Sequence, residues 1–469
     1  MSAPQSRYKT INPATGKVEK VFPETTDAEV TAALDKAHTA YGEWSTRPIA
    51  ERAEFLRKAA SHLRQRAEEY AQLMTREMGK LIDQARAETA LAADILEYYS
   101  KNGEKFLQPK PVPEAPGTTI LTQPIGVIMA VEPWNFPYYQ LARVAGPQLV
   151  SGNVVIFKHA SAVPACALAF ARLFEHADTP EGVYTNLFCT PKQVNMLIDD
   201  YRVRGVTLTG SEKAGAAVAE RAGRNLKKVV LELGGSDPFV VLPDADLENA
   251  AKQAVIGRMI TTGQTCVCSK RFIVIGKERG QVFLDGMVKY MSRLQPGDPQ
   301  DEKTSLGPLV AEDALTGLLS QIEQAKSHGA RVVLGGKRVD RPGWYLEPTI
   351  ITDITPENPL YYEETFGPIA SFYVVDTEQE AIDLANATKF GLGGSVFGAD
   401  VKHAHEVASK IYTGMVCVNC LPYTGPETPF GGVANSGYGR ELGEMGMGEF
   451  VNHKTVRNAP GEGGWGLTL

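Results

Sequence analysis

The stretch Ile125-Gly126-Val127-Ile128-Met129-Ala130-Val131 is almost entirely apolar, and a run of this length predicts a buried β-strand. The chain after it alternates between strand-like and helix-like segments. Further strands are expected at 153–158, 184–188, 205–208 and 229–233, with helices at 137–150, 162–177, 191–200 and 211–223. This alternation is typical of a doubly wound parallel sheet, which binds ligands at the carboxyl ends of its strands.

A second alternating region follows Gly235, and a helical region precedes Ile125. The later region predicts helices at 246–262, 278–294 and 311–328 and strands at 271–275 and near 331–334, 371–375 and 393–397. The first hundred residues predict helices at 27–42, 49–79 and 80–101, because Ala, Glu, Leu, Arg and Lys dominate there. The expected fold class is α/β, with two doubly wound (Rossmann-like) α/β domains and a small β element.

The small β element is expected where residues 106–124 leave the helical pattern. This segment is rich in proline at first and then contains the β-prone run Thr118-Thr119-Ile120-Leu121-Thr122. The C-terminal run from Phe450 to Val456 is also strand-like. Exposed strands of this kind often pair across subunits, so a homodimer or homotetramer is expected.

Composition excludes several classes of partner. The 469 residues carry a net charge of −7 and no dense Lys/Arg block, which argues against binding nucleic acid or an anionic membrane. The polar start of the chain lacks the apolar core of a signal peptide, and the apolar runs are too short to cross a bilayer. The sequence therefore predicts a soluble, cytoplasmic protein.

Six cysteines in so long a chain do not indicate a disulfide scaffold. A four-thiolate zinc site built from Cys266, Cys268, Cys417 and Cys420 is one alternative, since short cysteine pairs are its usual source of ligands. In a strand over 415–419, however, Cys417 and Cys420 would point to opposite faces. We expect no metal.

The candidate chemistry centres on one thiol and one carboxylate. The turn-like stretch Gly263-Gln264-Thr265-Cys266-Val267-Cys268-Ser269-Lys270-Arg271 places a cysteine just before an apolar strand. In the other segment, Val229 to Gly235, Glu232 interrupts an apolar strand. A thiol on a turn and a base at a strand end are the two groups that a thiol-nucleophile enzyme needs, although each could instead be an ordinary buried residue.

The usual dinucleotide fingerprint of three spaced glycines is absent. The segment Thr207 to Gly215 offers Gly210 at a strand–helix junction, where free N–H groups at the helix N-terminus suit a phosphate. A glycine at a tight turn is an equally good explanation, so this signal alone is weak.

Nearly the whole chain resembles the aldehyde dehydrogenase superfamily. Its motifs appear in order: Pro133-Trp134-Asn135-Phe136-Pro137, Phe157-Lys158-His159-Ala160-Ser161, Thr209-Gly210-Ser211, Glu232-Leu233-Gly234-Gly235, Gly263-Gln264-Thr265-Cys266 and Glu363-Glu364-Thr365-Phe366-Gly367-Pro368. The resemblance implies a cofactor-binding domain over 1–105 and 125–233, a catalytic domain over 234–430 and an oligomerisation element over 106–124 and 448–460.

The resemblance also implies catalytic roles. The Cys266 thiolate would attack the aldehyde carbon, and the Asn135 amide with the Cys266 N–H would stabilise the resulting oxyanion. After hydride transfer leaves a thioester, Glu232 would activate the water that releases the acid. Burial should raise the pKa of Glu232.

Cofactor positions follow from the same motifs. The residues implied to contact NADP or NAD are Trp134, Lys158, Ser161, Gly210, Ser211, Leu233, Glu364 and Phe366. Many family members have a glutamate where this chain has Ser161. Because a hydroxyl does not repel a 2′-phosphate and Lys158 adds positive charge, NADP is expected to be preferred and NAD to remain possible. A simple helix cap is the other interpretation of Ser161.

The residues of these motifs look most like those of succinate-semialdehyde dehydrogenases. This resemblance implies oxidation of succinic semialdehyde to succinate. Arg143 would hold the substrate carboxylate, and Tyr423 or Thr424 would donate to it. Ile260 stands where related sequences have a second arginine, so glutarate semialdehyde or another small aldehyde is an alternative. Arg143 as an ordinary surface residue and a non-catalytic family member are further alternatives.

Cys268 lies two residues after the candidate nucleophile. A disulfide with Cys266 would block the enzyme under oxidation, so Cys268 is a candidate redox partner. A silent neighbouring thiol is the alternative.

Overall fold

The first sheet of the computed structural model, which describes residues 6–422 and 424–458, confirms the doubly wound pattern. It has six strands in the order β19-β9-β8-β5-β6-β7, all parallel except the edge strand β19. Its strands are β5 (Val127–Glu132), β6 (Val154–His159), β7 (Tyr184–Asn186), β8 (Val203–Thr209), β9 (Lys228–Glu232) and β19 (Gly437–Tyr438). The connecting helices are α5 (Pro137–Ser151), α6 (Pro164–His176), α7 (Pro191–Asp199) and α8 (Glu212–Arg224).

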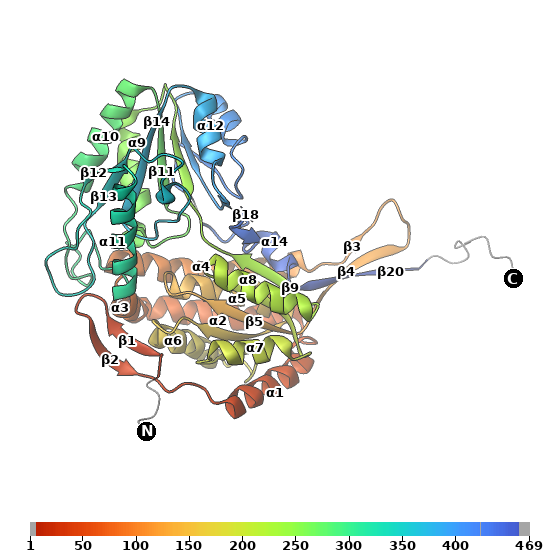
Figure 1. The fold of residues 1–469 in the computed structure, drawn as a ribbon. Helices are drawn as coiled ribbons and strands as arrows, with labels where there is room; N and C mark the ends of the chain where they lie inside the picture. Colours follow the sequence, from red (N-terminus) through yellow and green to blue (C-terminus); the bar gives the residue numbers. More distant parts are fainter. Residues whose placement is uncertain (1–5, 423, 459–469) are drawn as a thin grey trace.

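The N-terminal region adds a hairpin and four helices to this unit (Figure 1). They are β1 (Lys9–Asn12), β2 (Lys17–Val21), α1 (Asp27–Trp44), α2 (Ile49–Gln65), α3 (Ala67–Met78) and α4 (Ile82–Phe106). The helix expected over 49–79 is interrupted, because Arg66 leaves the helical conformation at φ −115° and ψ 23°. Gly79 ends α3 in the left-handed region at φ 77°, where glycine is favoured.

The second sheet has seven strands in the order β12-β13-β14-β11-β10-β16-β17. These are β10 (Asp237–Val241), β11 (Ser269–Ile275), β12 (Arg331–Leu334), β13 (Thr349–Thr352), β14 (Ile369–Val375), β16 (Ser395–Phe397) and β17 (Cys417–Val418). Its helices are α9 (Leu247–Met259), α10 (Lys277–Met291), α11 (Glu312–Ser327), α12 (Glu378–Asn386) and α13 (Val401–Ala408). Sequence patterns missed β10, β13, α12 and α13.

Smaller elements complete the chain and correct one predicted boundary. They are η1 (Ile260–Gly263), η2 (Pro359–Tyr361), β15 (Phe390–Gly391), β18 (Val433–Ala434) and α14 (Gly443–Gly448). The helix expected over 246–262 ends at Met259, because Thr261 and Thr262 adopt left-handed conformations that an α-helix excludes.

A three-stranded antiparallel sheet projects from the body of the molecule (Figure 1). It consists of β3 (Lys110–Pro111), β4 (Thr118–Pro124) and β20 (Val451–Arg457), and β20 pairs with β4 along its length. The extended excursion and the C-terminal strand expected from the sequence therefore lie side by side. Within the described ranges, no helix is long and apolar enough to span a membrane.

Candidate active site

The predicted site residues come from facing edges of the two large sheets. Asn135, Gly210 and Leu233 follow β5, β8 and β9, so they lie at the carboxyl edge of the first sheet. Cys266 precedes β11 and Glu364 precedes β14, so both lie at the amino edge of the second sheet.

Two contacts join these edges. The Asn135 side-chain amide donates to the Gln264 carbonyl at 3.0 Å, and the Trp134 ring meets the Phe366 ring edge-on at a centroid distance of 5.8 Å. Asn135 therefore lies beside the Cys266 turn, with the second N–H of its amide left for another acceptor.

The turn that carries Cys266 is held in an unusual backbone conformation. Thr261, Thr262 and Gly263 have φ values of 52°, 55° and 76°. A Cβ on Gly263 would stand 2.2 Å from the Gly367 carbonyl oxygen, so only glycine fits there. The buried Gln264 side chain accepts from the Val310 N–H at 3.0 Å and donates to the Thr261 carbonyl at 3.1 Å. Such over-determined turns are typical of functional sites.

The Cys266 thiol lies in a low-dielectric environment between cations and anions. Burial raises its pKa to about 12, while Lys270 and then Arg143 act in the opposite direction. In this state the thiol is protonated at neutral pH. Nucleophilic attack therefore requires that a base take the thiol proton.

Glu232 supplies a carboxylate in the same region. It is buried, and neither of its carboxylate oxygens has a hydrogen-bond partner in the described part of the chain. Burial raises its pKa well above the usual range, and the positive charge of Arg143 opposes that shift. A buried carboxyl with free oxygens and a raised pKa is suited to general base catalysis near neutral pH.

Arg143 is buried rather than on the surface, so the surface-residue interpretation is wrong. Its guanidinium forms an ion pair with Glu441, donates to the Thr209 hydroxyl at 2.8 Å and lies 4.9 Å from the Phe430 ring centroid. The positive charge of Arg143 reaches Cys266 and Glu232 electrostatically. Any carboxylate that binds Arg143 must share it with Glu441.

Sequence reasoning missed Glu441 and Glu132, which complete this charged cluster. Glu441 accepts from the Thr207 hydroxyl at 3.1 Å, and burial raises the pKa values of both carboxyls. Glu132 interrupts an apolar run just as Glu232 does, and that signal could have identified it. Glu441 lies in a glycine-rich segment with no periodic pattern.

The predicted cofactor residues other than Glu364 and Phe366 lie along the carboxyl edge of the first sheet. The Ser211 hydroxyl accepts from the Ala214 N–H at 3.3 Å and caps α8, while a Cβ on Gly210 would contact only the Leu208 side chain, at 3.6 Å. Lys158, near the end of β6, is partly buried, and burial lowers its pKa. Ser161 does not cap α6, because that helix begins at Pro164 with Val163 as its N-cap, so the capping interpretation is wrong.

Glu364 contacts the segment that connects β9 to β10 and, through Lys270, the turn that carries Cys266. Its Oε1 accepts from the Gly235 N–H at 3.1 Å and pairs with the Lys270 ammonium at 3.0 Å. Leu233, two residues before Gly235, is buried against Gly215 of α8.

The loop expected to contact the substrate is described only in part. Tyr423 lies outside the described residues, and Thr424 is half-buried. The loop leads into Phe430, which packs beside Arg143. Arg258, two residues before Ile260, is completely buried, and its Nη2 donates to the Gly263 carbonyl at 2.6 Å.

Cys268 is close to Cys266 in sequence, but its thiol is turned away. Its Sγ lies 3.8 Å from the carbonyl oxygens of Arg258 and Ile260, and no disulfide joins it to Cys266. Among the described residues, no group of three His, Cys, Asp or Glu side chains is placed to hold a metal.

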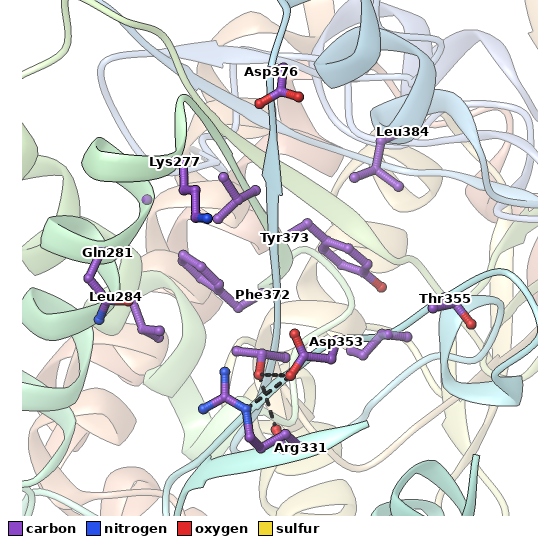
Figure 2. Close-up of a pocket in the computed structure, with 14 residues that line it drawn as sticks. Lys277, Gln281, Leu284, Arg331, Asp353, Thr355, Phe372, Tyr373, Asp376 and Leu384 are labelled. Carbon is purple, nitrogen blue, oxygen red and sulfur yellow. Dashed lines mark hydrogen bonds and ion pairs between the residues drawn. The ribbon is translucent and has the colours of Figure 1, made fainter. Parts of the chain in front are cut away.

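A separate hollow of about 520 Å³ lies at the other edge of the second sheet (Figure 2). Lys277 and Asp376, which follow β11 and β14, line it together with Phe372 and Tyr373. Because Cys266 and Glu364 precede the same two strands, the hollow is distinct from the site described above.

The comparisons with known proteins agree with this geometry. The model of the aldehyde dehydrogenase family matches residues 1–456. The chain is 47% identical to succinate-semialdehyde dehydrogenase (NADP+) of Deinococcus radiodurans, over 97% of this chain and 96% of the relative. It is 45% identical to a probable enzyme of that name from Synechocystis sp., over 95% and 98% of the two chains.

A solved structure shares both the fold and much of the sequence. The succinic semialdehyde dehydrogenase of Streptococcus pyogenes, in complex with NADP+ as the cofactor, superposes with a TM-score of 0.94 and 44% identity over 96% of this chain and 99% of that one. The chain belongs to the aldehyde dehydrogenase family.

Proposed function

We propose that this protein oxidises succinic semialdehyde to succinate with NADP as the preferred hydride acceptor and NAD as a possible one. The convergence of Cys266, Asn135 and Glu232 between the two sheets carries the proposal. The substrate and cofactor of the Deinococcus and Streptococcus relatives support the choice of reaction.

The first step forms a bond between the Cys266 sulfur and the aldehyde carbon. The thiol loses its proton to a base, and the carbonyl oxygen takes the negative charge. The free N–H of the Asn135 amide and the Cys266 N–H stabilise that oxyanion more strongly than the neutral carbonyl, and this difference lowers the barrier. NADP, when bound, supplies the hydride acceptor, and a Cys266 thioester remains.

Release of the acid requires water and a base. Glu232 accepts a proton from the water that attacks the thioester carbon. The carbon–sulfur bond then breaks and returns the Cys266 sulfur as a leaving group. The raised pKa of Glu232 makes it a stronger base than an exposed carboxylate.

The cofactor assignment rests on the residues at the carboxyl edge of the first sheet. The absence of a side chain at Gly210, the N-terminus of α8 beside Ser211 and the Lys158 ammonium fit a phosphate-rich ligand. Ser161 would accommodate a 2′-phosphate, Glu364 would bind ribose hydroxyls, and Trp134, Leu233 and Phe366 would line the same site.

The remaining assignments belong to this proposal. Arg143, Tyr423 and Thr424 would bind the substrate carboxylate. The cofactor-binding domain would comprise residues 1–105 and 125–233, and the catalytic domain residues 234–430.

The projecting sheet of β3, β4 and β20 would form a homodimer or homotetramer interface, because its outer strands leave backbone groups for a partner. The protein would act in the cytoplasm, since the free cysteines of the described chain suit a reducing compartment.

The decisive experiment compares initial rates of reduced-cofactor formation from succinic semialdehyde with NADP and with NAD. We expect turnover with higher kcat/KM for NADP and its loss in Cys266→Ser. Turnover only with uncharged aldehydes would retain the chemistry and reject the substrate. Absence of turnover with any aldehyde, glutarate semialdehyde included, would favour a non-catalytic family member.

A second measurement separates the two chemical steps. Glu232→Gln should still release about one equivalent of reduced cofactor per active site in a rapid burst, followed by turnover slowed about a hundredfold or more. A burst that disappears together with turnover would assign Glu232 to the first step instead.

A further inference from the structure

Lys270 is a buried lysine four residues after Cys266, and the steps above give it no role. It is the second residue of β11 and is 1% exposed. A lysine so completely buried is rare unless its ammonium is fully paired.

The Lys270 ammonium has an oxygen partner for each of its three protons. It donates to the Cys266 carbonyl at 2.6 Å and to the Thr265 carbonyl at 3.2 Å, and it pairs with Glu364 Oε1 at 3.0 Å. Two of these oxygens belong to the nucleophile turn. The third belongs to the segment that precedes β14.

The other buried cations nearby donate to backbone groups, although Nε and Nη1 of Arg258 have no hydrogen-bond partner in the described part of the chain. Arg258 donates to the Gly263 carbonyl, and Arg271 donates to the carbonyls of Ser236, Leu384 and Ala385. The charged groups that act on the Cys266 sulfur are two cations, Lys270 and Arg143, and two carboxyls, Glu364 and Asp237. The carboxylate of Glu441 offsets the charge of Arg143, as Glu364 offsets that of Lys270.

We propose that Lys270 is a positioning residue that fixes the Cys266 turn and stabilises the Cys266 thiolate, and that Glu364 sets how much of its charge the sulfur feels. The carbonyl contacts fix the turn, since the ammonium holds two successive peptide units. The positive charge of Lys270 also acts on the Cys266 sulfur, where it lowers the pKa of the thiol.

The proposal predicts opposite effects for the two partners. Removal of the Lys270 charge destabilises the thiolate, whereas removal of the Glu364 charge stabilises it. Where Glu364 binds ribose hydroxyls, as the proposed function holds, cofactor binding would draw Glu364 away from Lys270 and make the thiol more reactive.

The test is the rate of Cys266 alkylation by iodoacetamide between pH 6 and pH 10, followed by mass spectrometry of the Cys266 peptide without aldehyde or cofactor. Lys270→Gln keeps a hydrogen-bond donor and removes the charge. We expect alkylation about tenfold slower at each pH in this range, because a rise of about one unit in the thiol pKa lowers the thiolate fraction tenfold. Glu364→Gln should react several-fold faster, and Lys270→Arg should stay near the native rate.

A matched control is Lys289→Gln, because Lys289 is an exposed lysine on α10 that pairs with Glu248. In Lys289→Gln, Cys266 should be alkylated at the native rate. A folded Lys270→Gln variant with an unchanged profile would overturn the proposal. If Lys270→Gln does not fold, Glu364→Gln decides: faster alkylation supports the proposal, and an unchanged or slower rate overturns it.

This readout is independent of the proposed substrate. Loss of succinic semialdehyde turnover with the alkylation pattern intact would reject the substrate and keep the role of Lys270.

Discussion

The Arg143 guanidinium and the Glu441 carboxylate form an ion pair that is almost completely shielded from solvent. Arg143 also interacts electrostatically with two further buried carboxyls, Glu232 and Glu132, and Arg440 adds a second positive charge near Glu232. Since charges this deeply buried are costly unless paired, the cluster controls both the protonation of Glu232 and the availability of Arg143 to a substrate.

Arg143→Met should lower the stability of the fold. The single change leaves Glu441 without its cation and should lower the free energy of unfolding by about 3 kcal/mol. The double variant Arg143→Met with Glu441→Met should recover most of this loss, because it removes both buried charges. Chemical denaturation of the native protein, Arg143→Met, Glu441→Met and the double variant measures the coupling between the two charges.

The same double variant tests the substrate assignment. Its KM for succinic semialdehyde should rise at least about tenfold more than its KM for an uncharged aldehyde of similar length. Equal increases for both aldehydes would show that Arg143 does not bind the substrate carboxylate.

Glu441→Gln should shift the pH dependence of acid release. Burial raises the pKa of Glu232, Arg143 lowers it, and the charge of Glu441 raises it again. Removing the Glu441 charge therefore lowers the pKa of Glu232. Because the base acts in its deprotonated form, the acidic limb of the kcat profile should move to lower pH. Movement to higher pH, or none in a folded variant, would contradict this.

Ser161→Glu should reverse the cofactor preference. A carboxylate at this position would repel the 2′-phosphate of NADP, and kcat/KM for NADP should fall about a hundredfold, as two like charges at close range imply. The value for NAD should hold or rise. Ser161→Ala is the matched control. It should lower kcat/KM for NADP only by the contribution of one hydrogen bond from a hydroxyl donor.

The sequence predicted best what depends on local pattern. The alternation of strands and helices and the positions of Asn135, Glu232 and Cys266 at strand ends followed from short contiguous motifs. Elements without such a pattern were missed: β10 begins with Asp237 and Pro238, two residues that disfavour strands, and only its burial between β11 and β16 explains it.

The partners of the site residues could not be predicted, because they depend on tertiary packing. Glu441 meets Arg143 only after β19 and the segment behind it return to the first sheet. Lys270 was visible beside Cys266 in the sequence, but its bond to Glu364 depends on β14 lying next to β11.

The position of Cys268 allows a test of whether it forms a disulfide with Cys266 under oxidation. Its thiol faces the carbonyls of Arg258 and Ile260, so a disulfide with Cys266 requires the turn to rearrange. We expect peroxide inactivation of the native enzyme to be reversed by a dithiol, and Cys268→Ala to become irreversibly inactivated as Cys266 oxidises further. Mass spectrometry should show a loss of two hydrogens in the native peptide. If a dithiol restores peroxide-treated Cys268→Ala as well as it restores the native enzyme, the disulfide is excluded. Cys266 would then be protected from further oxidation without Cys268.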